Sequence, residues 1–298
     1  MKITQLRDAI AVAETGSLRA ASRQLGVAQS AITKSIQLLE KELGAPLFER
    51  QKKGVVLTPL GTLFVRRART ATQELERGRE EIQQHLGSGT GRVVASLSTV
   101  PHMAILPKVL PRFLKKYPDA ELVVLEGLGF ASVEAQLRNA EVDFYIGVEP
   151  TGRVPAGYTS EMLFSNQRVI IGRANHPLGE ARSLRALSQA RWVTSVPASA
   201  KYITNLFSKQ KIEAPTRFSY ASSVLGQIVF ILNSDMLALV PQQWLDFPLL
   251  KGKIQRIEVR EAIETPSIYM IRRSAFPLTP AAEHFCDLAR RVAASMDQ

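Results

Sequence analysis

The sequence has one cysteine, Cys286, and four histidines that lie far apart. A single cysteine excludes an intramolecular disulfide, and the scattered histidines offer no metal-ligand spacing. No run reaches the roughly 18 apolar residues of a membrane span, and Asp8 interrupts the N-terminus before a signal-peptide h-region can form. These absences predict a cytoplasmic protein with no membrane association, no metal and no cofactor.

Common catalytic motifs are also missing. The chain has no Gly-x-Ser-x-Gly, His-Glu-x-x-His or Walker pattern. His284 and Cys286 are two residues apart on a predicted helix, so their side chains face in different directions. The glycine-rich run 87–91 precedes a strand-like run and does not join a strand to a helix, which indicates a hinge and not a phosphate-binding loop. The sequence therefore argues against an enzyme.

Positive charge, in contrast, is in excess. Lys and Arg number 38 against 27 Asp and Glu, a formal net charge of +11 over 298 residues, 45% of them hydrophobic. Such a chain is long enough for two or three packed cores. Residues 1–69 hold 12 basic and 5 acidic side chains, a net of +7, whereas residues 70–298 hold 26 and 22, a net of +4. Because basic surfaces attract polyanions, the first quarter of the chain is the candidate for binding nucleic acid.

Three short helices are predicted near the N-terminus. Thr4 is expected to cap the first, which ends near Gly16, and Ser17 to cap a second over 18–25. A third runs over about 29–43 and ends at Gly44. Two short helices joined by a glycine-containing turn form a helix-turn-helix, whose second member enters the major groove.

The third predicted helix has one apolar face. Ile32, Ile36, Leu39 and Leu43 stack within a narrow sector, and the opposite face is free. That free face begins with amide, hydroxyl and ammonium groups able to bond base edges and phosphates: Gln29, Ser30, Thr33 and Lys34. Periodicity alone equally fits an amphipathic helix with a solvated face.

Two strand-like runs, 47–50 and 55–57, follow around a basic turn. Gly54 suits a positive φ in such a turn. Arg50, Lys52 and Lys53 would contact phosphates beside the groove, or else form a solvated turn. The prediction for residues 1–58 is a winged helix-turn-helix domain.

The segments 16–36, 39–50 and 57–61 together resemble the N-terminal signature of LysR-type transcriptional regulators. The family usually has Ser where this chain has Ala28 and Pro where it has Ser30, so the cap of the recognition helix is altered. The resemblance implies double-stranded promoter DNA and RNA polymerase as partners. Gln29 and Thr33 match the family pattern, and the DNA-contact role is carried over to them first.

A long helix is predicted over residues 59–87, started by Thr58 and Pro59. Apolar or small residues recur along it at intervals of three or four: Phe64, Ala68, Ala71, Leu75, Gly78, Ile82 and Leu86. Its charge density argues against a core helix within one domain, so the stripe predicts a partner helix and a dimer. The resemblance implies the same dimerisation helix, within a homotetramer.

Strand-like runs alternate with helical stretches in the rest of the chain, which is the pattern of parallel α/β sheets. The runs are 93–98, 121–126, 143–148, 168–172, 192–195, 216–220, 236–240 and 267–272. The resemblance implies an effector-binding regulatory domain over 88–298 with two Rossmann-like subdomains, similar to periplasmic binding proteins. Subdomain I would comprise 88–161 and 266–298, and subdomain II 162–265.

Ligand sites in parallel sheets lie beyond the carboxyl ends of the strands. This rule selects residues after four predicted strands: Ser98, Thr99, Val100, Gly127, Phe130, Gly147, Ser199, Ala200 and Tyr202. The hydroxyls equally fit plain helix caps. Helix N-termini favour anions, and Phe130 and Tyr202 can flank a ring, so the predicted effector is a small organic acid, anionic or aromatic.

Two other functions compete with this interpretation. A solute-binding protein would need the missing signal peptide and would leave the first 58 residues unexplained. An architectural DNA-binding protein has no use for a sensor-like α/β region of about 200 residues. We therefore expect an effector-responsive transcriptional regulator in which ligand binding biases the angle between the subdomains.

Overall fold

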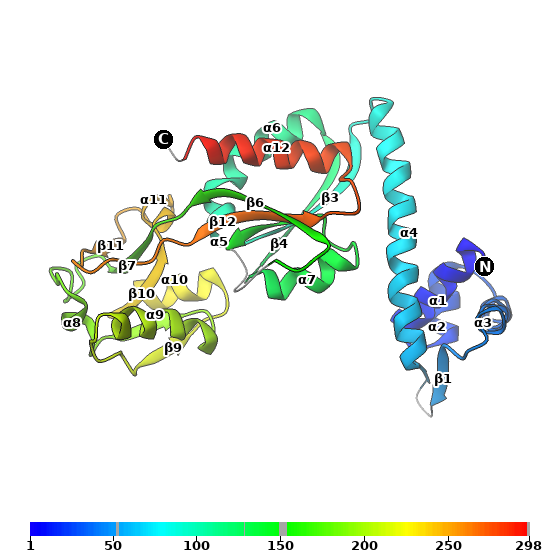
Figure 1. Ribbon diagram of the computed structural model, residues 1–298, viewed down its shortest axis with the longest axis horizontal. Helices are drawn as coiled ribbons and strands as arrows, with labels where there is room; N and C mark the ends of the chain where they lie inside the picture. The colour runs from blue at the N-terminus through cyan, green and yellow to red at the C-terminus, as the bar shows by residue number, and fades with distance from the viewer. Residues whose placement is uncertain (52–53, 128, 149–153, 297–298) are drawn as a thin grey trace.

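The computed structural model describes residues 1–51, 54–127, 129–148 and 154–296 (Figure 1). A small N-terminal unit and a larger α/β region lie on either side of one long helix, α4 (Pro59–His85). The N-terminal unit contains α1 (Ile3–Thr15), α2 (Leu18–Leu25), α3 (Gln29–Leu43), β1 (Phe48–Gln51) and β2 (Gly54–Leu57). No helix of the described residues is long and apolar enough to cross a membrane.

Glycines end the three N-terminal helices, as predicted. Gly16, Gly26 and Gly44 adopt left-handed conformations with φ of 63°, 67° and 68°, and each cap amide bonds back to a helix carbonyl. Ser17 caps α2 by accepting a hydrogen bond from the Ala20 amide. The predicted cap at Thr4 is wrong.

The start of α1 is set by Gln5. Its side-chain oxygen accepts a hydrogen bond of 2.6 Å from the Lys2 amide, so the helix begins at Ile3 and Thr4 lies in its first turn. At the other end of the unit, β1 and β2 pair as an antiparallel hairpin. Gly54 has a φ of 140°, and a Cβ there would lie 2.5 Å from the Gly16 carbonyl oxygen, so this position requires glycine.

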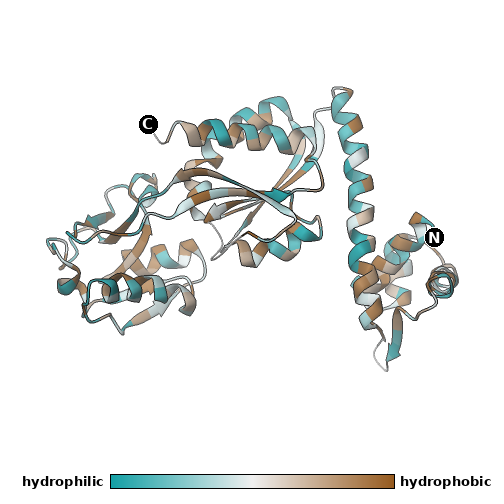
Figure 2. Ribbon diagram, in the orientation of Figure 1, coloured by the Kyte–Doolittle hydropathy of each residue, from teal (hydrophilic) through white to brown (hydrophobic). Residues whose placement is uncertain are grey.

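Helix α4 has 27 residues and is therefore about 40 Å long. Thr58 caps it by accepting a hydrogen bond of 2.8 Å from the Gly61 amide. Charged residues dominate its surface (Figure 2), but Leu75, Ile82 and Leu86 are 52%, 61% and 76% exposed. These three apolar side chains belong to the stripe that predicts a partner helix.

Buried polar contacts join α4 to the α/β region. The Arg77 guanidinium lies 2.5 Å from the Asp143 carboxylate and 2.9 Å from the Ala140 carbonyl oxygen. Glu74 accepts hydrogen bonds from both Arg77 and Arg273, at 2.9 and 2.6 Å. The long helix is thereby attached to the sheet of its own chain.

The first α/β unit, here subdomain I, is built on a sheet with the order β4-β3-β5-β12-β6. Its strands are β3 (Thr90–Leu97), β4 (Asp119–Glu126), β5 (Phe144–Val148), β6 (Tyr158–Ser165) and β12 (Ser267–Arg273). Its helices are α5 (Thr99–Ala104), α6 (Leu106–Lys116), α7 (Phe130–Arg138) and α12 (Pro280–Ala294). Helices α6 and α12 cover one face of the sheet and α7 covers the other (Figure 1).

The second unit, subdomain II, is built on a sheet with the order β11-β7-β10-β8-β9. Its strands are β7 (Arg168–Arg173), β8 (Arg191–Thr194), β9 (Phe218–Tyr220), β10 (Met236–Pro241) and β11 (Ile254–Ile257). Its helices are α8 (Leu184–Leu187), α9 (Pro197–Lys209), α10 (Val224–Leu232) and α11 (Gln243–Asp246). The segments that connect the two units run side by side, and the Asn166 amide donates a hydrogen bond of 2.9 Å to the Pro266 carbonyl.

Both sheets are mixed, which corrects the expectation of parallel sheets. Strand β12 is antiparallel to β5 and β6, and β7 is antiparallel to β10 and β11. The sequence analysis also missed β6 and β11 as strands. Strand β6 is mostly exposed and β11 is four residues long, so neither shows a clear apolar alternation.

Candidate DNA interface and effector cavity

Helix α3 presents the predicted polar face to solvent. Ile32, Ile36 and Leu39 are buried in the core of the N-terminal unit, whereas Gln29, Ser30 and Lys34 are exposed. Leu43, predicted on the apolar face, is 41% exposed, because it is the last residue of the helix. Thr33 is half-buried, and its hydroxyl donates a hydrogen bond of 3.0 Å to the Gln29 carbonyl. The helix lies on the side of the unit away from α4, where nothing else of the described chain covers it (Figure 1).

The acidic residues of α3 are held away from this face. Glu40 accepts hydrogen bonds from the amides of Leu47 and Phe48, at 2.7 and 3.1 Å. Glu42 lies 2.6 Å from the terminal ammonium of Met1. With no carboxylate in its first turn, the start of α3 is suited to approach phosphates.

The hairpin after α3 carries one described cation of the predicted wing, the exposed Arg50 on β1. Lys52 and Lys53 lie outside the described residues. The Ala28 position, where the family usually has Ser, caps α3 without any side-chain hydrogen bond. The DNA-contact roles of all these side chains stay predictions.

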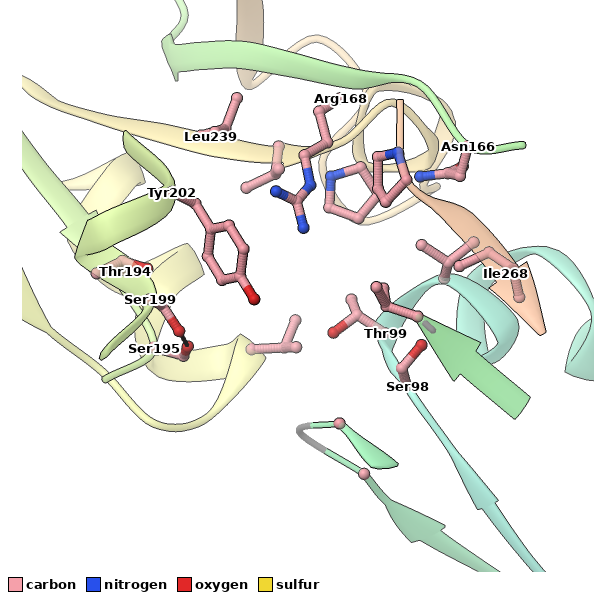
Figure 3. A pocket seen from close by; sticks show the side chains of 18 of the residues that line it. Ser98, Thr99, Asn166, Arg168, Thr194, Ser195, Ser199, Tyr202, Leu239 and Ile268 are labelled. Carbon is pink, nitrogen blue, oxygen red and sulfur yellow. Dashed lines mark hydrogen bonds between the residues drawn. The ribbon is translucent and has the colours of Figure 1, made fainter. Parts of the chain in front are cut away.

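A cavity of about 550 Å³ lies between the two subdomains. Of the residues predicted to bind an effector, those on its walls are Ser98, Thr99, Val100, Gly127, Phe130, Ser199 and Tyr202. Figure 3 shows Ser98 and Thr99 facing Tyr202 and Ser199 across the open space. Gly147 and Ala200 are not among the lining residues. Gly147 lies against the Tyr145 hydroxyl, and Ala200 is a buried residue of α9.

The hydroxyls of the cavity do not serve as helix caps. Ser98 precedes α5 but caps nothing, and its Oγ atom is buried without a hydrogen-bond partner in the described structure. Ser199 lies inside the first turn of α9, and its hydroxyl bonds Ser195 at 2.9 Å. Because a buried hydroxyl without a partner is costly, Ser98 is an unsatisfied polar group of the cavity wall, and its effector-binding role stays a prediction.

The two aromatic residues differ in availability. Phe130 is 4% exposed, and its ring packs edge-on against Tyr145 and Tyr158. Tyr202 is 49% exposed, and the guanidinium of Arg168 lies 5.0 Å from its ring centre. Tyr202 is therefore the ring that a ligand can reach.

Arg168 is one of several lining residues that the strand-end rule does not select, and it is the one described cation among them. The half-buried guanidinium points into the cavity (Figure 3). Among the described residues its guanidinium has no hydrogen bond and no ion pair within 4.0 Å; Glu264 acts on it electrostatically from a longer distance and itself pairs with Lys209. Burial lowers the pKa of Arg168 below its ordinary value, although an arginine stays charged at neutral pH.

The direction of strand β7 explains why Arg168 lies in the cavity. The rule that ligands bind at the carboxyl ends of strands selects the cavity residues only where the strands run parallel. Because β7 is antiparallel to β10, its first residue, Arg168, pairs with Pro241 at the end of β10. Likewise, Ile268 near the start of β12 pairs with Val148 at the end of β5, and both line the cavity.

Comparison with known families agrees with this geometry. Residues 3–62 match the model of the bacterial regulatory helix-turn-helix proteins of the lysR family. Residues 84–294 match the LysR substrate binding domain. The chain belongs to the LysR family of transcriptional regulators.

Relatives match this LysR regulator over most of its length. It is 26% identical over 286 residues to the HTH-type transcriptional regulator GalR of Pseudomonas putida, covering 95% of this chain and 72% of the relative. It is 23% identical over 283 residues to TdcA of Escherichia coli K12, covering 94% of this chain and 89% of the relative. Full-length CbnR, solved in complex with its target DNA, shares the fold with a TM-score of 0.71 at 20% identity, covering 98% of this chain and 100% of that one.

Membership of the LysR family also settles the question of an enzyme, because these proteins are regulators. Cys286 fits this assignment. The side chain is fully buried in α12, and burial raises the pKa of its thiol well above the ordinary value. A buried thiol of this kind is a core residue and not a nucleophile.

Proposed function

We propose that this LysR regulator binds a small organic acid in the cavity between its subdomains and reports that binding to promoter DNA. The observation that carries the proposal is Arg168, a half-buried guanidinium without a carboxylate partner in the described structure. An unpaired charge in a partly dry site is costly, and an anionic ligand removes that cost. The hydroxyls of Ser98, Ser195 and Ser199 add further hydrogen-bonding groups.

The DNA contacts in this proposal come from the winged helix-turn-helix. Gln29, Ser30 and Thr33 would contact base edges or phosphates, and Lys34 and Arg50 would contact phosphates. Such a module acts in the cytoplasm, where promoter DNA and RNA polymerase are found. The proposed domains are the DNA-binding domain over residues 1–58, the dimerisation helix over 59–87 and the regulatory domain over 88–298.

The oligomer in this proposal is built through α4. Leu75, Ile82 and Leu86 are exposed on one stripe, and pairing with α4 of a second copy would bury them. A two-fold dimer places two recognition helices on two half-sites, and two such dimers make the homotetramer.

Coupling between the cavity and the DNA-binding units would run through the connecting segments and helix α4. A ligand that contacts both subdomains stabilises one angle between them, and the connecting segments at Asn166 and Pro266 line the same cavity. Subdomain I is attached to α4 through Arg77 and Asp143. A change of angle would therefore alter how the paired DNA-binding units sit on the promoter.

A calorimetric and footprinting experiment tests the proposal. Full-length protein is titrated with small carboxylic acids and with their neutral amides, and the footprint on promoter DNA is recorded with and without each ligand that binds. Binding of acids that changes the footprint supports the proposal. If only the amides bind, the proposal that the effector is an organic acid is wrong. If an acid binds but the footprint is unchanged, a plain solute-binding protein is favoured. DNA binding without any ligand response favours an architectural protein.

A further inference from the structure

The charges around the cavity are unevenly divided between its walls. Arg168 lies on the wall of subdomain II, and Glu126 and Glu134 lie on the wall of subdomain I. None of the other described lining residues carries a formal charge at neutral pH. Among the described lining residues, the positive charge thus lies on the wall of subdomain II and the negative charge on the wall of subdomain I.

Arg168 is suited to hold one carboxylate in a fixed direction. Its guanidinium stacks on Tyr202, with 5.0 Å from the guanidinium carbon to the ring centre, and this contact limits its rotation. Arginine binds carboxylates through two parallel hydrogen bonds, which sets orientation as well as affinity. The hydroxyls of Ser195 and Ser199 lie on the same side of the cavity (Figure 3).

The opposite wall accepts hydrogen bonds. Glu126 ends β4, is exposed, and has no ion pair among the described residues. Glu134 on α7 lies 3.7 Å from Arg138, a partly exposed pair that contributes little and leaves acceptor capacity. Ionised carboxylates only accept hydrogen bonds. A second negative group on a ligand would be repelled there, whereas an amine or hydroxyl would be bound.

We propose that the effector is a monocarboxylate whose far end carries an amine or a hydroxyl group. Its carboxylate pairs with Arg168 in subdomain II, and its donor groups face Glu126 and Glu134 in subdomain I. The ligand spans both subdomains in this orientation. This inference rests on the proposed function and specifies the class of acid.

Matched probes test the charge pattern on the full-length protein. One aromatic set is 3-aminobenzoate, benzoate, terephthalate and benzamide; one aliphatic set is 4-aminobutanoate, butanoate, succinate and butanamide. Trp244, one of two tryptophans in the chain, lines the cavity, so its fluorescence reports occupancy alongside calorimetry at constant ionic strength. In at least one set, we expect the amino acid to bind most tightly, then the simple monocarboxylate, then the dicarboxylate.

Two variants and their controls identify the residues. Arg168→Gln should weaken carboxylate binding at least about tenfold, which is about 1.4 kcal/mol. Arg173→Gln, at the other end of β7 and paired with Asp235, should not. Glu126→Gln should reduce the preference for the amino acid over the dicarboxylate severalfold, and Glu121→Gln, at the other end of β4, should leave it unchanged.

The outcomes separate this inference from the proposed function. The inference is overturned if dicarboxylates bind more tightly than amino acids, or if Glu126→Gln and Glu134→Gln leave the preference for the amino acid unchanged. Either result is compatible with an organic acid as the effector. Tighter binding of the amides overturns both. Failure of every probe to bind at millimolar concentration also overturns the inference, because this charge pattern has to recognise its minimal charged groups.

Discussion

Arg77 and Arg168 are partly buried cations in two regions of the molecule, and they differ in whether carboxylates of the chain pair with them. At the junction of α4 with subdomain I, Arg77 is 15% exposed and bonds Glu74, Asp143 and the Ala140 carbonyl. In the cavity, Arg168 has a tyrosine ring beside it and no carboxylate partner among the described residues. The chain itself completes the first site. In the proposed function, an outside anion completes the second.

The same strands of subdomain I connect the two regions. Asp143 directly precedes β5, and Val148 at its other end lines the cavity. Arg273 ends β12 beside Glu74, and Ile268 near the start of β12 lines the cavity. The junction with α4 and the cavity therefore lie at opposite ends of the same two strands, and the proposed coupling runs through this sheet.

The largest expected effect comes from breaking the junction. Arg77→Ala leaves the buried Asp143 carboxylate without its main cationic partner, which should lower the free energy of unfolding by about 3 kcal/mol. Urea denaturation followed by circular dichroism measures the loss. Arg79→Ala is the matched control, because its pair with Glu76 is 80% and 66% exposed and should be worth little. Equal losses in the two variants would show that the junction is not a stabilising contact.

The pH dependence of that loss is the next test. Burial raises the pKa of Asp143 above its ordinary value, and Arg77 and the Val94 amide oppose the rise. Without Arg77, the pKa of Asp143 should rise further. A carboxyl with a higher pKa folded than unfolded takes up a proton on folding, so the folded state regains stability as the pH falls.

The deficit of Arg77→Ala should therefore be largest at neutral pH and shrink as the pH falls toward 3.8, the ordinary pKa of an aspartate. Denaturation of wild type and variant at matched pH values measures it. Adding Asp143→Asn to the variant should remove the pH dependence of the deficit. A deficit that is constant with pH, or that grows on acidification, would contradict an uncompensated Asp143 carboxylate.

Arg168→Gln should behave in the opposite way to Arg77→Ala. Removal of a cation without a carboxylate partner breaks no ion pair, so without ligand the free energy of unfolding should stay within about 1 kcal/mol of wild type. Carboxylate binding should nevertheless be lost. A destabilisation as large as that of Arg77→Ala would mean that Arg168 has a structural role, and the contrast between the two regions would fail.

Features that depend on residues close together in the sequence were predictable, and contacts between residues far apart in the sequence were not. The glycine helix ends, the Thr58 cap and the face of α3 depend on residues a few positions apart. The junction joins Arg77 to Asp143 and Glu74 to Arg273, pairs separated by 66 and 199 residues, and no local pattern signals such contacts. Arg168 was missed because its position depends on the direction of β7, which the strand pattern does not encode.

DNA binding provides a smaller and independent effect. Lys34 on α3 is exposed and pairs with no carboxylate among the described residues. Lys34→Ala should weaken promoter binding at all salt concentrations and reduce the slope of log affinity against log salt by about 1. Fluorescence anisotropy over a salt series measures both. Lys41→Ala, in the last turn of α3, is the control; binding undiminished by Lys34→Ala would remove Lys34 from the interface.

The smallest expected effect tests the contribution of one subdomain I hydroxyl, that of Thr99, to ligand binding. Thr99 begins α5 and lines the cavity opposite Arg168, and its side chain makes no hydrogen bond within the described structure. Thr99→Ala should leave stability and ligand-free DNA binding unchanged, since no contact is broken. It should weaken effector binding by the free energy of one hydrogen bond, about 1 kcal/mol. Calorimetry with the tightest carboxylate probe measures this loss, and Thr204→Ala on the exposed side of α9 is the control. Unchanged affinity would remove Thr99 from the binding site and leave the contribution of subdomain I to its other lining residues, such as Glu126 and Glu134.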